Sequence, residues 1–276
     1  MPTNSCAPHM YDVHTSLKKH GKAPRRVVVL HGGPGAPGSA AQLARDISSR
    51  HGVLEPWQRA DSVEALVAEL ACVLRYDAGL PATLVGHSWG ALLGYMLTAR
   101  HPELVNKLVM IGAPPFEARH AKGIMPMRMN AMSEAQREDA SELISVMADK
   151  TRMQREGDQI LVRFGRLMEQ ADAYNPLPQQ PEPMIANYRQ FSAVMGQVTE
   201  LRRSGALIAL GESIRCPVVA LHGEYDSHPV DAVRRPLGYS LTNFRCVVLP
   251  NCGHTPWQER EARAVFYECL FAELES

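Results

Sequence analysis

The sequence predicts an α/β fold, with a mostly parallel sheet, helices on both of its faces and one helical insertion. Short apolar runs rich in β-branched residues alternate along the chain with segments of helical periodicity. Strands joined through helices pair in parallel, and the helices then cover both faces of the sheet. The alternation stops between residues 116 and 211, where we expect helices but no strand.

The strands and helices are expected where the apolar pattern is clearest. Six runs are predicted strands: 26–30, 52–57, 81–86, 106–111, 217–222 and 244–249. Three segments outside the insertion are predicted helices: 61–74, 89–100 and 259–274. The first of these helices is expected to begin with a capping box formed by Asp61 and Glu64.

The insertion divides the chain into a predicted core, residues 1–115 and 212–276, and a predicted helical cap, residues 116–211. Within the cap, Ser133 and Gln136 form a capping box before one helix, and a second helical stretch carries Leu161, Phe164 and Met168. A Pro-rich segment follows at 175–183. The insertion holds nine of the 13 methionines, which either pack a core of its own or line a substrate pocket.

Charge and composition exclude several classes of protein. The 29 Lys and Arg residues balance 29 Asp and Glu, so no basic excess exists for binding nucleic acid. No apolar run is long enough to insert in a membrane, and the first 22 residues lack the apolar core of a signal peptide. The six scattered cysteines are expected to be free thiols in a reducing cytoplasm. Neutral net charge does not fix the oligomeric state.

Gly86-His87-Ser88-Trp89-Gly90 matches the Gly-x-Ser-x-Gly pattern and lies between a predicted strand and a predicted buried helix. In that context the pattern predicts a sharp turn that presents the serine hydroxyl as a nucleophile. Gly86 and Gly90 are expected because a Cβ at either position would clash where strand and helix approach closely. The alternative is a helix start that Ser88 merely caps.

A nucleophilic serine needs a base and an orienting carboxylate. His254 and Asp226 each follow a predicted strand, so both are expected at the same edge of the sheet as Ser88. The chain order serine, aspartate, histidine is that of one hydrolase fold. Three other carboxylates are alternatives to Asp226, with less support: Glu117, Glu224 and Asp231.

The loop His31-Gly32-Gly33-Pro34-Gly35 is a candidate oxyanion hole. A tetrahedral oxyanion needs two fixed N–H donors, for which we select Gly33 and Trp89. Gly32 supports the loop, which His31 is expected to brace. A plain glycine turn is the alternative.

Together, residues 27–35, residues 86–90, Asp226 and His254 resemble the α/β-hydrolase superfamily, most closely its proline iminopeptidase branch and related uncharacterised hydrolases. The resemblance covers 26–115 and 216–275 and implies that the insertion caps the active site. The chain departs from the branch by having His87 in place of glycine and Glu55-Pro56-Trp57-Gln58-Arg59 in place of an Asp-Gln-Arg-Gly segment. Its N-terminal region is also short. Glu169 and Glu182 are the candidate cap carboxylates for a substrate amine.

These residues predict a serine hydrolase that transfers an acyl group from a small or medium carboxylic ester to water. The alternatives are an aminopeptidase of the iminopeptidase type and a non-hydrolytic lyase or ligand-binding member of the same fold. We expect no metal and no cofactor, because the 11 histidines form no H-x-H or H-E-x-x-H motif. Three further residues are expected to be structural: Cys252, His87 and His222.

Overall fold

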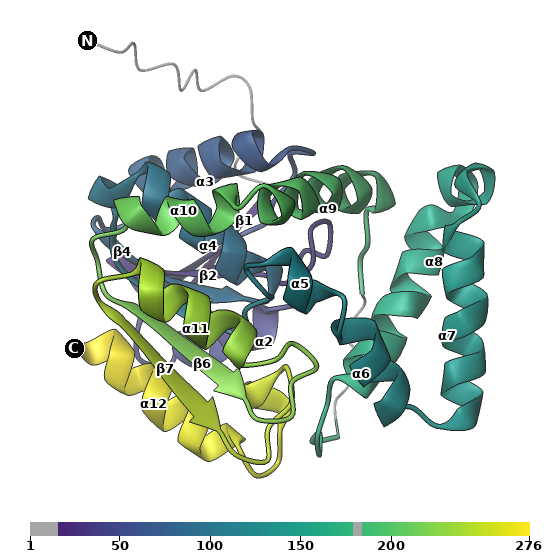
Figure 1. Cartoon of the computed structure of the whole chain (residues 1–276). Coiled ribbons are helices and arrows are strands. Elements are labelled where there is room, and N and C mark those ends of the chain that lie inside the picture. Colours follow the sequence, from purple (N-terminus) through teal and green to yellow (C-terminus); the bar gives the residue numbers. More distant parts are fainter. Residues whose placement is uncertain (1–15, 179–183) are drawn as a thin grey trace.

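The computed structural model describes residues 16–178 and 184–276, and Figure 1 shows a central sheet with helices on both sides. The sheet has seven strands in the order β1-β3-β2-β4-β5-β6-β7. Only the β1–β3 pair is antiparallel. The strands are β1 (Leu17–His20), β2 (Arg25–Leu30), β3 (Gly52–Pro56), β4 (Ala82–His87), β5 (Val105–Ile111), β6 (Val218–Gly223) and β7 (Phe244–Leu249). The six predicted strands are confirmed, whereas β1 was missed because its Leu-Lys-Lys-His sequence has no buried residue.

Alternate residues of the strands face two separate apolar cores. Val28 and Leu30 face one core, while Val27 and Val29 face the other. Helices α3 (Val63–Asp77), α4 (Trp89–Arg100) and α11 (Asp231–Ser240) cover the first face. Helices α2 (Ala41–Ile47) and α12 (Arg263–Glu275) cover the second. The predicted two-sided arrangement is confirmed.

Two helix starts differ from the prediction. The N-cap of α3 is Ser62 and not Asp61, because the Ser62 side chain accepts a hydrogen bond from the Ala65 amide. Helix α12 begins at Arg263 and not at Glu259, since a 3₁₀ turn (Pro256–Gln258) precedes it and the Glu259 carboxylate binds backbone amides of other segments.

The segment between β5 and β6 folds as helices. They are α5 (Ala118–Ala121), α6 (Ile124–Ala131), α7 (Glu134–Met147), α8 (Lys150–Ala171), α9 (Tyr188–Arg203) and α10 (Ala206–Ala209), followed by a 3₁₀ turn (Leu210–Ser213). The capping box of Ser133 and Gln136 is present at the start of α7. Figure 1 shows α7 and α8 as a hairpin projecting from the body, with α9 and α10 lying over the sheet. Val194, Val198 and Leu207 belong to the main core, so the insertion has two parts. Its bounds, 116–211, stay a prediction.

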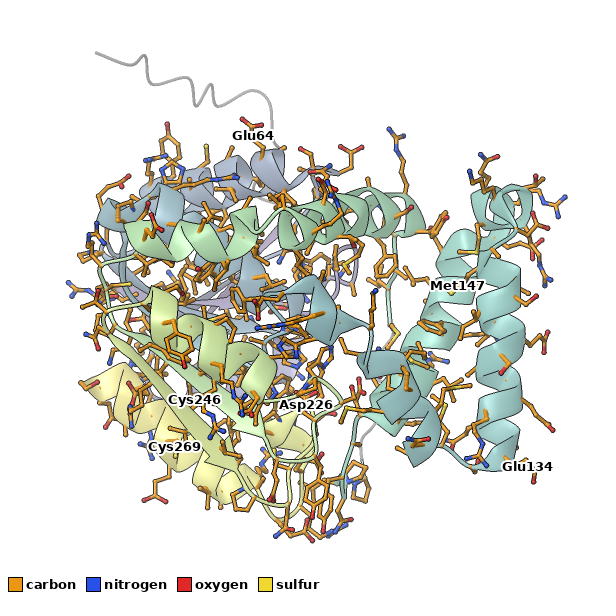
Figure 2. The ribbon with its side chains drawn as sticks, viewed as in Figure 1. Glu64, Glu134, Met147, Asp226, Cys246 and Cys269 are labelled. Carbon is orange, nitrogen blue, oxygen red and sulfur yellow. The ribbon has the colours of Figure 1, made fainter. Side chains whose placement is uncertain are left out.

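The α7–α8 hairpin has an apolar core of its own. Met132, Met153 and Met168 are buried in it, and Met125, Met129 and Met147 pack against it. Figure 2 shows Met147 in this hairpin, well away from Asp226. For these six methionines the core-packing interpretation holds.

The cysteines depart from the sequence prediction. Cys72 is disulfide-bonded, so the expectation of six free thiols is wrong. Disulfide pairing depends on distance in the fold, which scattered sequence spacing does not reveal. Four cysteines are free thiols: Cys216, Cys246, Cys252 and Cys269. Cys6 lies outside the described residues. Within residues 16–178 and 184–276, no helix is long and apolar enough to cross a membrane.

Candidate active site

Ser88 lies on a strained turn between β4 and α4. Its backbone has φ of +51°, a left-handed conformation that non-glycine residues rarely adopt. The turn is tight: a Cβ on Gly86 would come within 2.3 Å of the Gly90 carbonyl oxygen, and one on Gly90 within 2.3 Å of the Leu30 carbonyl oxygen. Backbone strain held by close packing is typical of a functional turn, and this one leaves Ser88 half-buried at the carboxyl edge of the sheet.

Asp226 and His254 are in direct contact. The Nδ1 atom of His254 donates to Oδ2 of Asp226 at 2.7 Å, and both side chains are buried. Burial alone would raise the pKa of Asp226, but the charges and hydrogen bonds of His254 and His228 hold it well below its usual range. Burial likewise lowers the pKa of His254, yet the Asp226 carboxylate outweighs this and the net pKa is raised. The ionised carboxylate of Asp226 therefore favours the protonated form of the His254 imidazole.

Backbone contacts bring this pair close to Ser88. The Ser88 amide donates to the Ile111 carbonyl at 2.9 Å, and the next residue, Gly112, lies against the His254 ring, where an added Cβ would come within 2.9 Å of Nδ1. His87, the neighbour of Ser88, donates from Nε2 to the His254 carbonyl at 3.1 Å. Among the described residues no hydrogen bond joins the Ser88 hydroxyl to the His254 imidazole. Such bonds often tighten only when substrate is present.

The loop at residues 31–35 follows β2 beside this turn. Gly33 has φ of +58°, and a Cβ on Gly32 would come within 3.4 Å of the Ser88 Cβ. His31 is fully buried: its Nδ1 donates to the Gly32 carbonyl at 3.0 Å, and its Nε2 accepts from the Gln58 amide at 3.3 Å. Burial lowers the pKa of His31, so the ring is neutral and braces the loop.

Trp89 begins α4, where main-chain N–H groups have no acceptor within the helix. Its indole Nε1 donates to Oε1 of Gln58 at 2.6 Å. The cap residue Gln190 in turn donates to the Gln58 carbonyl at 3.2 Å. Gln58 therefore joins the turn after Ser88, the glycine loop and the cap.

Three further histidines surround the pair of Asp226 and His254. His228, which is not among the residues predicted from the sequence, donates from Nδ1 to Oδ1 of Asp226 at 2.8 Å. Burial lowers the pKa of His228 to about 4 and that of His87 to about 3, so both rings are neutral near pH 7. His222 donates from Nε2 to the His228 carbonyl at 2.7 Å. The signal that could have revealed His228 is its position two residues after Asp226.

The segment between β5 and β6 contacts the loop that carries His254 through Asp172, which no sequence pattern indicates. The Asp172 carbonyl accepts from the His254 amide at 2.9 Å. The Asp172 carboxylate is paired with Arg128 of α6 and accepts from the Ser227 hydroxyl. Burial raises the pKa of Asp172, but Arg128 more than compensates and the net pKa is lowered.

Glu259 makes a second connection between cap and core. Its buried carboxylate accepts from the amides of Tyr174 and Asn175 in the cap, each at 2.8 Å, and from the amide of Gly253 at 2.9 Å. Gly253 precedes His254, so this carboxylate ties the end of the cap to the histidine loop. Its partners are 84 and 85 residues away in the cap, a separation that sequence patterns do not reveal.

The remaining candidates lie outside this arrangement. Glu117 is paired with Arg119, Asp231 with Arg234, and Glu224 is exposed. Cys252 is buried, and burial raises the pKa of its thiol. Glu169 lies near enough to His254 to interact with its charge, and burial raises its pKa. Glu182 lies outside the described residues.

One group of possible metal ligands occurs in the described ranges. The ligand atoms of Asp226, His228 and His254 lie within 4.8 Å of one another. Both imidazole Nδ1 atoms are already hydrogen-bonded to the Asp226 carboxylate. The group is therefore accounted for by these hydrogen bonds.

Comparison with known proteins identifies the family. The model of the alpha/beta hydrolase family matches residues 9–266. The chain belongs to the alpha/beta hydrolase family. Its sheet order and the strained serine turn after β4 are the elements of that fold. No curated protein sequence matches the chain.

Several solved structures share this alpha/beta hydrolase fold. VinJ is 20% identical with a TM-score of 0.63, and the match covers 94% of each chain. A putative lipase from Acinetobacter baumannii AYE is 17% identical with a TM-score of 0.61, covering 94% of this chain and 87% of the other. The enol-lactonase from Burkholderia xenovorans LB400 is 17% identical with a TM-score of 0.60, covering 94% and 96%. At these identities the likeness establishes the fold alone.

Proposed function

We propose that this hydrolase cleaves a small or medium carboxylic ester through an acyl-enzyme formed on Ser88. The observation that carries the proposal is the hydrogen bond of 2.7 Å between His254 and a buried Asp226, at the sheet edge where Ser88 occupies its strained turn. An imidazole oriented by a carboxylate is the base that a serine nucleophile requires.

The steps follow from the proposed roles. His254 takes the Ser88 proton as the hydroxyl oxygen attacks the ester carbonyl, and Asp226 stabilises the resulting imidazolium. The main-chain N–H groups of Gly33 and Trp89 bind the oxyanion, each contributing about 3 kcal/mol in comparable sites. The imidazolium then gives its proton to the departing alcohol. Water attacks the acyl-enzyme with His254 again as base, which releases the acid and restores Ser88.

An ester is favoured over an amide by analogy with relatives of the same fold. Two of the similar structures are described as a putative lipase and an enol-lactonase, both of which act on ester bonds. The apolar character of the cap is weaker support, because six of its methionines pack the hairpin core. The natural substrate is expected to be a small molecule.

An aminopeptidase is the second candidate because Glu169 interacts with the charge of His254. A carboxylate beside the reacting centre would bind a substrate ammonium group. The neighbouring Asp172 is already neutralised by Arg128, so Glu169 would act without a second free carboxylate.

A paired assay separates the candidates. The wild-type protein and Ser88→Ala are incubated with p-nitrophenyl esters of increasing acyl length and with proline naphthylamide. We expect the wild-type protein to hydrolyse the esters and Ser88→Ala to have no activity. Circular dichroism should show that both proteins are folded. Faster release of naphthylamine would favour the aminopeptidase. Retained ester hydrolysis in Ser88→Ala would refute the role of Ser88. Labelling of Ser88 by a fluorophosphonate without turnover of any ester or amide would favour a ligand-binding member of the fold.

A further inference from the structure

Asp226 holds two imidazoles at once. Its Oδ2 accepts from Nδ1 of His254 at 2.7 Å, and its Oδ1 accepts from both the ring Nδ1 and the main-chain amide of His228, each at 2.8 Å. Both oxygens of the carboxylate therefore have fixed partners. The three residues are each less than a tenth exposed, so water competes little for these bonds.

The two rings also pack on each other. Their centroids are 4.5 Å apart and their planes differ by 29°, which is a stacked geometry. His222 fixes the main chain of His228 by donating to its carbonyl at 2.7 Å. His228 is thus held from its ring, its amide and its carbonyl.

Several charged and titratable groups surround this pair, among them His222, whose Nε2 lies 3.6 Å from Oδ2 of Asp226. Burial lowers the pKa of His228, and the charges of Asp226, His254 and Arg128 also act on it. The charge of His228 in turn lowers the pKa values of Asp172 and His87. Arg128 is itself neutralised by Asp172, and Glu169 of α8 is close enough to His254 for their charges to interact. The neutral ring of His228 is therefore the second side-chain donor on the Asp226 carboxylate.

A hydrogen bond to a carboxylate has two consequences. It fixes the orientation of the carboxylate, and it stabilises the negative charge, which weakens the pull of that charge on any other partner. With His228 removed, Oδ1 would keep only the main-chain donor. The carboxylate would then rotate more freely and attract the proton of His254 more strongly.

We propose that His228 is a positioning residue of the proposed hydrolase, which holds Oδ2 of Asp226 toward His254 and takes up part of the carboxylate charge. His228 acts through Asp226 and needs no contact with substrate. The proposal rests on the proposed function for its catalytic consequence. It goes beyond that function because a triad requires only one histidine.

Three variants distinguish the effect of the hydrogen bond from the effect of ring stacking. His228→Phe keeps a stacked ring and loses the donor, His228→Ala loses both, and His228→Asn keeps a donor near the position of Nδ1. The acid limb of kcat/KM against pH is measured for each, together with the titration of the His254 imidazole by NMR, which needs no hydrolysis. We expect His228→Phe and His228→Ala to shift both midpoints upward by about half a pH unit. The same two variants should lower kcat by ~10-fold with little change in KM, by analogy with the hydrogen-bond partners that orient metal-binding histidines. His228→Asn should keep the midpoints and kcat close to those of the wild-type protein.

The outcomes are distinct. Unchanged midpoints in His228→Phe and His228→Ala, or an equal shift in His228→Asn, would overturn the role of the hydrogen bond. If the His228→Phe and His228→Ala proteins do not fold, the ring-nitrogen NMR chemical shifts of wild-type His228 decide. A proton on Nδ1 between pH 5 and 8 supports the proposal, and a proton on Nε2 alone overturns it. Failure of the wild-type protein to hydrolyse any ester or amide would instead refute the proposed function, while the NMR titration would still test His228.

Discussion

The main-chain amide of His254 donates a hydrogen bond to the main-chain carbonyl of Asp172, at 2.9 Å. Asp172 directly follows the last residue of α8, so the cap helix ends against the loop that carries the proposed base. The Glu259 carboxylate binds amides on both sides of the same junction. Main-chain hydrogen bonds therefore join the end of α8 to the loop that carries His254.

Arg128→Ala should destabilise this junction. Asp172 is 4% exposed, and removal of its partner would leave a buried carboxylate paired only with the Ser227 hydroxyl. Breaking a buried pair costs about 3 kcal/mol, which urea denaturation would measure. Arg152→Ala, which breaks an exposed pair with Glu156, is the control and should change stability by less than about 0.5 kcal/mol. Equal effects from the two variants would contradict the buried role of Arg128.

Glu259→Gln should lower both stability and hydrolysis. The substitution points an amide group at a backbone N–H, which leaves at least one of the three main-chain donors without its acceptor, at a cost of about 2 kcal/mol. The neighbouring Glu261 is exposed and bonds only the Asn175 side chain, so Glu261→Gln is a matched control. Thermal unfolding and ester assays on both variants make the comparison. An unaltered Glu259→Gln protein would show that the carboxylate is dispensable.

Gly33→Ala should reduce kcat by ~100-fold if the Gly33 amide binds the oxyanion, because φ of +58° disfavours a side chain and the donor would move. Gly38→Ala is the control for backbone strain, since Gly38 also has positive φ (+87°) and its added Cβ meets no atom closer than 3.9 Å. The control should lose stability but keep kcat. Similar kcat values for the two variants would remove Gly33 from the proposed oxyanion hole.

Hydrolysis should fall at acidic pH with a midpoint above 6.5. Burial lowers the pKa of His254, but Asp226 outweighs it, so the net pKa is raised from 6.5. The base must be neutral to accept the Ser88 proton, and activity is therefore lost as pH falls through this raised pKa. The profile of kcat/KM from pH 4 to 9 measures the midpoint of this loss. A rate that stays constant down to pH 4 is incompatible with a histidine base.

Periodicity and strand ends made much of this arrangement predictable. Ser88, Asp226 and His254 each follow an apolar strand, and parallel strands bring such positions to one edge. The contact between Asp226 and His254 follows from that rule. Strand β1 escaped prediction because its edge position leaves every residue at least partly exposed.

Contacts between loops that are far apart in the chain could not be predicted from the sequence. Asp172 bonds Ser227 across 55 residues, and no local pattern links them. The Cys72 disulfide has the same cause, since pairing depends on spatial distance. His228 was closer to prediction, because it follows Asp226 by two residues, but its ring direction depends on the turn after β6.

The central claim, that Ser88 is a nucleophile activated by His254, is tested most directly by mapping a fluorophosphonate adduct. The wild-type protein is treated with the probe at pH 8, digested and analysed by mass spectrometry, beside Ser88→Ala and His254→Ala. We predict a single adduct on the Ser88 hydroxyl, absent from Ser88→Ala and formed at least 100-fold more slowly in His254→Ala. An adduct on another residue, or labelling of Ser88 at the same rate without His254, would contradict the account.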